Sequence, residues 1–112
     1  MTLDEYQASA RSLAVYPQHA RILYPALKLA GEAGEVTEKL GKLMRDEGYQ
    51  AGQELTQEQN QGLVKELGDV LWYVANLAAD LGVSLESVGE TNLAKLRSRK
   101  ERGVITGSGD DR

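Results

Sequence analysis

The chain has no cysteine, one histidine and two prolines among its 112 residues. Without cysteine it can form neither a disulfide framework nor a thiolate zinc site, and nothing in it indicates an oxidising compartment. No apolar run approaches the roughly 18 residues that a membrane span needs. The first residues, Met1 to Glu5, are acidic where a signal peptide would be basic. These absences predict a soluble, untargeted, cytoplasmic protein.

The chain also has fewer basic than acidic side chains. The 13 Lys and Arg residues are outnumbered by 17 Asp and Glu residues, which gives a formal net charge of -4 and a sequence pI of about 5.0. This charge balance argues against a protein that binds nucleic acid through bulk positive charge. It is compatible with binding of a free nucleotide together with a metal ion. The length predicts one domain with one compact core, extended by self-association.

Apolar residues recur at three- and four-residue steps in four segments, which predicts an all-α fold. The first helix should begin at Thr2, whose spacing from Glu5 matches a capping box, and should end near Val15 because Pro17 follows. The second helix tolerates Pro25 only because that residue falls in its first turn. The predicted helices cover residues 2–15, 22–44, 61–81 and a segment that Ser84 caps after Gly82.

Two segments lack any apolar period. Residues 47–62 are rich in Gly and Gln and predict a mobile connection between the second and third helices. Residues 103–112 predict a Gly-rich tail that is extended or disordered without ligand. The sequence therefore predicts one all-α domain over residues 1–102 and a C-terminal tail over residues 103–112.

The third predicted helix is apolar on nearly all sides, and a helix of this kind must be covered on more than one face. In a chain this short, a second subunit is the expected cover. The same helix carries a polar stripe at steps of three and four residues, which places its members on one face. The stripe consists of Glu66, Asp69, Tyr73, Asn76 and Asp80.

Carboxylates in such apolar surroundings must be paired, neutralised or bound to metal, because they lose hydration worth several kcal/mol. The second helix offers a matching pair, Glu32 and Glu35, with Glu38 one turn further. Four carboxylates that face one another would repel without a cation. Since every candidate ligand is a hard oxygen donor, magnesium or manganese suits the site better than zinc or copper. The chemistry that follows is metal-assisted hydrolysis of a phosphate compound.

The fourth predicted helix adds a stripe of donors, Asn92, Lys95, Arg99 and Arg102. Lys and Arg suit the oxygens of a triphosphate, and Asn can bond a sugar hydroxyl or a base edge. Each pattern also has a plainer interpretation. A lone Glu-x-x-Glu pair is usually a solvated helix face, and cations near a helix C-terminus can simply complement its dipole. Trp72 and Tyr73 are more often core or subunit-contact aromatics, although Tyr73 lies on the carboxylate stripe and is a candidate substrate contact. His19 is expected to be an ordinary surface residue.

The ordered set of motifs resembles the MazG-like all-α NTP pyrophosphatases, which carry a Glu-x-x-Glu pair on one helix and a Glu-x-x-Asp pair on the next long helix. The pairs stand here as Gly31-Glu32-Ala33-Gly34-Glu35-Val36 and Lys65-Glu66-Leu67-Gly68-Asp69-Val70. The likeness extends to Tyr24-Pro25-Ala26-Leu27, to Asn92-Leu93-Ala94-Lys95-Leu96 and to the closing Arg102-Gly103-Val104-Ile105-x-Gly107-Ser108-Gly109-Asp110. Each pair is common, but the ordered set is specific.

The resemblance implies a four-helix MazG-like bundle, completed by homo-oligomerisation to a dimer or tetramer. It also implies magnesium-dependent cleavage, with manganese as a possible substitute, of a (deoxy)nucleoside triphosphate to the monophosphate and pyrophosphate for nucleotide-pool control. In family terms, the metal ligands are Glu32, Glu35, Glu66 and Asp69, and the substrate contacts are Asn92, Lys95 and Arg99. The resemblance makes Glu38 an auxiliary ligand or a base that acts through water. As a mechanistic hypothesis, we expect Glu35 or Glu38 to orient or deprotonate the attacking water and residues 107–110 to fold over the nucleotide.

Several alternatives stay open at this stage. The nearest are a related dUTP or phosphoribosyl-ATP hydrolase and, from a different class, a non-catalytic helical interaction module. The base, the sugar and the number of metal ions are not predicted. The long Gly- and Gln-rich connection between the acidic pairs departs from the compact family pattern.

Overall fold

The computed structural model describes all 112 residues as four α-helices and one short 3-10 helix, without strands. The elements in chain order are α1 (Leu3–Ser12), the 3-10 helix η1 (Gln18–Ala20), α2 (Leu23–Glu47), α3 (Gln57–Asp80) and α4 (Leu85–Glu101). The all-α fold class that the sequence predicts is confirmed. None of these helices combines the length and the hydropathy that a bilayer-spanning segment requires.

Local capping explains where the helices begin. The Thr2 side chain accepts a hydrogen bond from the Glu5 amide at 3.1 Å, and the Glu5 carboxylate accepts one from the Thr2 amide at 3.0 Å. Ser84 caps α4 by accepting from the Ser87 amide. Both caps agree with the sequence prediction, and so do the placement of Pro25 in the first turn of α2 and the left-handed Gly82 after α3.

Three predicted boundaries were wrong. The helix α3 begins at Gln57 rather than near residue 61, because Thr56 and Gln59 form a second capping box. The helix α2 continues past Met44 to Glu47, where Gly48 takes a left-handed conformation and ends it. The connection between the two helices is correspondingly shorter than predicted. The helix α1 ends at Ser12, and the residues that follow, Leu13 to Val15, gain little from packing because Leu13 and Val15 remain exposed.

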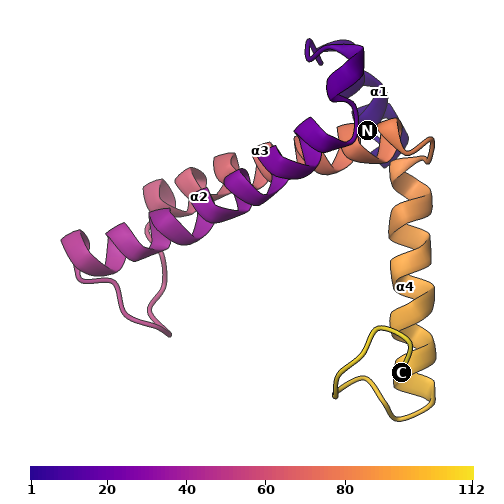
Figure 1. Cartoon of the computed structure of the whole chain (residues 1–112). Coiled ribbons are helices and arrows are strands. Elements are labelled where there is room, and N and C mark those ends of the chain that lie inside the picture. Colours follow the sequence, from indigo (N-terminus) through magenta and orange to yellow (C-terminus); the bar gives the residue numbers. More distant parts are fainter.

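The helices α2 and α3 form a long antiparallel hairpin, and α1 packs across the C-terminal part of α3 (Figure 1). The buried centre lies at this crossing, where Ala10, Ala75 and Leu85 meet. Tyr6, Trp72 and Val74 pack around them. The hairpin therefore presents both of its long helices to solvent over much of their length.

The direction of α4 is set by contacts with α1. The Gln7 side chain donates hydrogen bonds to the carbonyls of Ala75 and Val83 at 3.2 and 3.0 Å and accepts one from the Leu85 amide at 3.1 Å. It thereby ties α1 to the end of α3 and the start of α4. Beyond its first turns, α4 projects away from the hairpin (Figure 1).

The expectation of one compact core was wrong for the single chain. Its accessible surface is 8027 Å², whereas a compact monomer of this mass exposes about 6,100 Å². Its radius of gyration is 17.0 Å, against about 13 Å for a compact domain of this length. Large apolar side chains on α2 and α3 are exposed in consequence, among them Leu23, Leu27, Val64 and Leu67.

Candidate metal and nucleotide site

Three acidic side chains converge between α2 and α3. Glu32 on α2 and Glu66 and Asp69 on α3 each direct a carboxylate oxygen to a common point, and these oxygens all lie within 4.8 Å of one another. Glu32 and Glu66 are half-buried, and Asp69 is exposed. The antiparallel packing of the two helices brings one member of the predicted α2 pair, Glu32, to both members of the α3 pair. We call this group the acidic cluster.

The donor set of the acidic cluster fits a hard divalent cation. Carboxylate oxygens that crowd together repel one another, and a divalent ion relieves that repulsion. The exposure of Asp69 leaves one side open to water and phosphate, which magnesium normally retains among its ligands. Two lysines already supply part of the opposite charge: Lys28 lies 4.0 Å from Glu32, and Lys39 lies 3.0 Å from Glu66.

Glu35 and Glu38 do not join the acidic cluster. Glu35 lies one turn beyond Glu32 on α2 and is exposed. Glu38 is also exposed and pairs with Lys42 on the same helix, at 3.6 Å. Within the single chain, three of the four predicted ligands therefore meet, and the two predicted catalytic carboxylates face solvent beside them.

Tyr73 borders the acidic cluster, one turn after Asp69 on α3. Burial is the main cause that raises its pKa to about 12, and the neighbouring Tyr24 and the negative charges of Glu32 and Asp69 act in the same direction. The Tyr73 ring meets Tyr24 edge-on at 6.2 Å and Trp72 edge-on at 4.9 Å between centroids. Tyr73 therefore joins the carboxylates to a group of aromatic side chains.

These aromatic side chains line a cleft of about 320 Å³. Its walls come from the α1–α2 connection, the start of α2 and the middle of α3, and five of its six lining residues are hydrophobic. The lining residues are Val15, Tyr16, Pro17, Tyr24, Trp72 and Tyr73. An apolar cleft lined by aromatic rings has the chemistry that stacks a flat ring such as a nucleobase.

The remaining part of the polar stripe is structural. The Asp80 side chain is fully buried, where it accepts hydrogen bonds from the Tyr16 hydroxyl at 2.8 Å and from the Ile22 amide at 3.0 Å. Asn76 is also fully buried and donates to the Trp72 carbonyl. The polar stripe of α3 therefore has two parts. Glu66 and Asp69 form an accessible acidic end, whereas Asn76 and Asp80 form a buried end, where Asp80 holds the α1–α2 connection.

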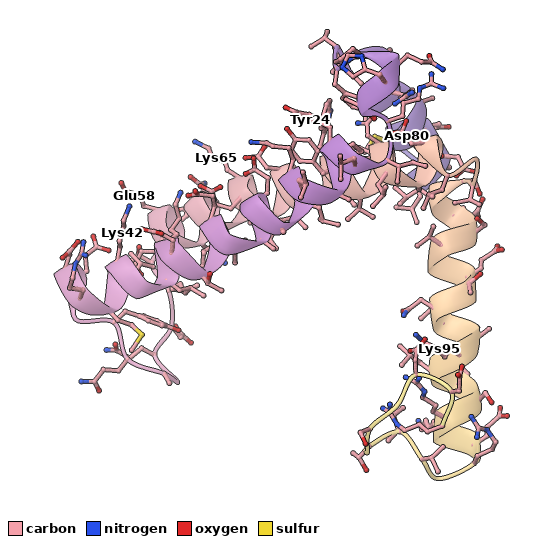
Figure 2. The ribbon with its side chains drawn as sticks, in the orientation of Figure 1. Tyr24, Lys42, Glu58, Lys65, Asp80 and Lys95 are labelled. Carbon is pink, nitrogen blue, oxygen red and sulfur yellow. The ribbon has the colours of Figure 1, made fainter.

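Asn92, Lys95 and Arg99 are not brought to the acidic cluster within one chain. They lie on α4, which projects away from the hairpin, and Figure 2 shows Lys95 far from Tyr24 and Lys65. Lys95 pairs with Asp110 of the tail at 3.0 Å, and the buried Arg99 bonds both the carboxylate and the carbonyl of Asp110. Hydrogen bonds from Lys95 and then Arg99 hold the pKa of Asp110 below its usual range.

The tail, which the sequence predicts to be extended or disordered, is irregular but folds back against α4. Arg112 donates to the carbonyls of Val104, Ile105 and Gly109, and Arg102 donates to the Arg112 carbonyl at 2.8 Å. His19, in η1, is an exposed residue, as expected.

Sequence reasoning missed the aromatic cleft and the role of Lys39. The cleft had one available signal, since Tyr-Pro occurs at 16–17 and again at 24–25, and both pairs flank the connection that forms its wall. No signal in the sequence pointed to the contact between Lys39 and Glu66, because an isolated lysine on an amphipathic helix is ordinarily a solvated residue.

The chain is similar to known proteins over most of its length. The model of the MazG nucleotide pyrophosphohydrolase domain matches residues 23–104, which include the acidic cluster and all of α4. The chain is 46% identical over 118 residues to the Gene 37 protein of Mycobacterium phage L5, and the match covers 100% of both chains. No solved structure matches. Because the family model matches well over half of it, this chain belongs to the MazG nucleotide pyrophosphohydrolase family.

Proposed function

We propose that this protein is a magnesium-dependent pyrophosphohydrolase that converts a (deoxy)nucleoside triphosphate and water to the monophosphate and pyrophosphate. The observation that carries the proposal is the convergence of Glu32, Glu66 and Asp69 within 4.8 Å in a chain of this family. The bond that breaks joins the α-phosphate to the leaving pyrophosphate. The proposed role is control of the nucleotide pool.

In this proposal the acidic cluster holds the cation. When bound, magnesium supplies charge for the phosphate oxygens and lowers the pKa of water. Glu35, exposed one turn beyond Glu32, orients the attacking water or accepts its proton, and Glu38 is the second candidate for that task. The aromatic cleft at Tyr24 and Tyr73 stacks the base, which leaves the triphosphate beside the carboxylates.

We further propose that a second subunit completes the site. The large accessible surface and the exposed apolar side chains of α2 and α3 indicate that another chain covers these helices. Because α4 projects away from the acidic cluster of its own chain, the α4 of a second copy would supply Asn92, Lys95 and Arg99 to that cluster. Light scattering should give a multiple of 12.2 kDa. Leu67→Lys should shift the mass toward the monomer, whereas Gln53→Lys, which adds the same charge in an exposed loop, should not. An unchanged mass for Leu67→Lys would remove this face from the interface.

The activity is tested by pyrophosphate release from a panel of triphosphates with magnesium. We expect Glu66→Gln and Asp69→Asn to lower kcat/KM by about 100-fold and to weaken Mn²⁺ binding in the absence of nucleotide, because each variant removes a cation ligand. Glu54→Gln, an exposed loop carboxylate, is the matched control. Equal turnover by the wild type and both cluster variants would refute the proposed activity. The substrate panel would also distinguish this activity from that of a dUTP or phosphoribosyl-ATP hydrolase.

Glu35 has a separate test. If it acts on water, Glu35→Gln should lower kcat while Mn²⁺ affinity stays within about twofold of the wild type. Should Mn²⁺ affinity fall together with kcat, Glu35 would be a cation ligand that joins the cluster in the assembled protein.

A further inference from the structure

A second hollow lies on the α2–α3 hairpin, on the opposite side of the acidic cluster from the aromatic cleft. It encloses about 540 Å³ and lies at the end of the hairpin where residues 48–56 connect α2 to α3. Its walls are mostly polar or charged, with a single hydrophobic residue among them. The lining includes two lysines and two glutamates, together with the helix-capping residue and a glycine: Lys39, Lys65, Glu47, Glu58, Thr56 and Gly62. We call it the hairpin pocket.

Lys39 belongs to both the hairpin pocket and the surroundings of the acidic cluster. Its ammonium group lies 3.0 Å from Glu66 and donates to the Gly62 carbonyl at 3.4 Å. The side chain crosses Gly62 so closely that a Cβ there would lie 3.6 Å from both Cδ and Nζ of Lys39. The lysine is 38% exposed, so its end can turn from the carboxylate toward the pocket without leaving a buried position.

The three features follow one another along the hairpin. The antiparallel helices pair Tyr24 with Tyr73 in the aromatic cleft, then Glu32 with Asp69 in the cluster, then Lys39 with Gly62 at the pocket. Glu32 and Lys39 are two helical turns apart, about 10 Å along α2. Figure 2 shows Tyr24, Lys65 and Glu58 in the same order along one edge of the hairpin. A nucleotide with its base in the cleft and its phosphates at the cluster therefore points its terminal phosphates at the pocket.

We propose that the hairpin pocket receives the pyrophosphate half of the substrate, and that Lys39 exchanges Glu66 for a phosphate oxygen when the cation binds. This rests on the proposed function. Without cation, Lys39 neutralises Glu66. A cation at the cluster takes over that carboxylate and repels the ammonium group, whose flexible stem and three donors suit it to a nearby phosphate. Lys65 lines the same pocket, where the two lysines are matched by the carboxylates of Glu47 and Glu58, and Gln59 already donates a hydrogen bond to Glu47.

The test measures three ligands by calorimetry on the full chain: Mn²⁺ alone, pyrophosphate with magnesium, and a nucleoside monophosphate with magnesium. We expect Lys39→Met to bind Mn²⁺ about threefold more tightly, because a competing positive charge is gone. The same variant should bind pyrophosphate about tenfold more weakly and the monophosphate within twofold of the wild type. Lys39→Arg should restore pyrophosphate binding.

Arg45→Met is the matched control, since Arg45 lies on the same helix, carries the same charge and pairs only with the neighbouring Asp46. It should leave all three affinities unchanged. The opposite signs for Mn²⁺ and pyrophosphate separate the proposed role from a loss of folding, which would weaken every ligand. Equal losses for pyrophosphate and monophosphate, or no change for either, would overturn the proposal. So would loss of pyrophosphate binding in Lys95→Met with full retention in Lys39→Met.

The outcome for Lys39 is separable from the outcome for the enzyme. If the wild type hydrolyses triphosphates and Lys39→Met matches Arg45→Met for every ligand, the pocket assignment fails while the proposed function stands. If no triphosphate is hydrolysed but Lys39→Met still loses pyrophosphate selectively, the activity fails and the pocket remains a pyrophosphate site.

Discussion

Nη1 of Arg11 lies 2.8 Å from Oδ1 of Asp80, and this ion pair joins α1 to the C-terminal end of α3. The Asp80 side chain is fully buried, and its other oxygen holds the Tyr16 hydroxyl and the Ile22 amide. Ile22 has φ of +68°, a conformation that a β-branched residue adopts only when its surroundings hold it there. Asp80 thus secures the connection that forms one wall of the aromatic cleft.

Replacing Asp80 by Asn should lower the free energy of unfolding by about 2–3 kcal/mol. The amide removes the negative charge opposite Arg11 and replaces one acceptor oxygen with an NH₂ donor, although the partial exposure of Arg11 keeps the cost below that of a fully buried pair. Urea unfolding followed by circular dichroism measures the change. Asp46→Asn breaks the exposed Arg45–Asp46 pair and should cost close to nothing. Similar losses in the two variants would show that burial does not strengthen the Asp80 pair.

The contribution of Asp80 should depend on pH. Burial alone would raise its pKa, but the hydrogen bonds from Ile22 and Tyr16 and the charges of Arg11 and Arg21 outweigh burial and lower the pKa from its ordinary 3.8. A carboxyl whose pKa is lower in the folded than in the unfolded state stabilises the fold at pH values above its unfolded-state pKa. This stabilisation is lost as the pH falls through the folded-state pKa. The stability difference between wild type and Asp80→Asn should therefore be constant from pH 7 to about 5 and shrink below about pH 4. A difference that stays constant down to pH 3 would contradict this account.

Tyr24→Leu should raise KM for the preferred triphosphate by about tenfold, with a smaller effect on kcat. The ring of Tyr24 forms a wall of the cleft proposed for the base, and loss of a stacking partner costs about 1–3 kcal/mol per base. Steady-state kinetics across the triphosphate panel would also show weaker discrimination between bases. Tyr49→Leu removes a tyrosine from the α2–α3 connection and should leave KM unchanged. If the two variants behaved alike, the base would lie elsewhere.

Two glycines at the end of α2 should respond to alanine in opposite directions. Gly41 lies inside the helix, and a Cβ added there would meet no neighbouring side chain within 4 Å, so Gly41→Ala should stabilise the protein by about 0.5–1 kcal/mol. Gly48 ends the helix at φ +68°, where a Cβ is strained, and Gly48→Ala should destabilise it by about 1 kcal/mol. Thermal unfolding of both variants tests the pair, and a shift of the same sign in both would contradict the assigned backbone conformations.

Features that depend on neighbouring residues could be predicted from the sequence. The capping box at Thr2 and Glu5 and the cap at Ser84 are short-range hydrogen bonds that the chain makes whatever its tertiary fold. The box at Thr56 and Gln59 was equally local, and it was missed because the polar residues that follow hide the helix. The convergence of Glu32 with Glu66 and Asp69 was also predictable, since helical periodicity fixes which side chains share a face.

The sequence by itself determined the four helices, their apolar faces and the acidic residues beside those faces, because these follow from spacings within one helix. Only the tertiary structure decided that Lys39 meets Glu66, that two Tyr-Pro segments close a cleft beside Tyr73, and that α4 leaves the hairpin with Lys95 and Arg99. Those relationships join residues far apart in the chain. They depend on the angle at which helices cross, and that angle is set by packing around Gln7, Ala75 and Leu85 rather than by any local pattern.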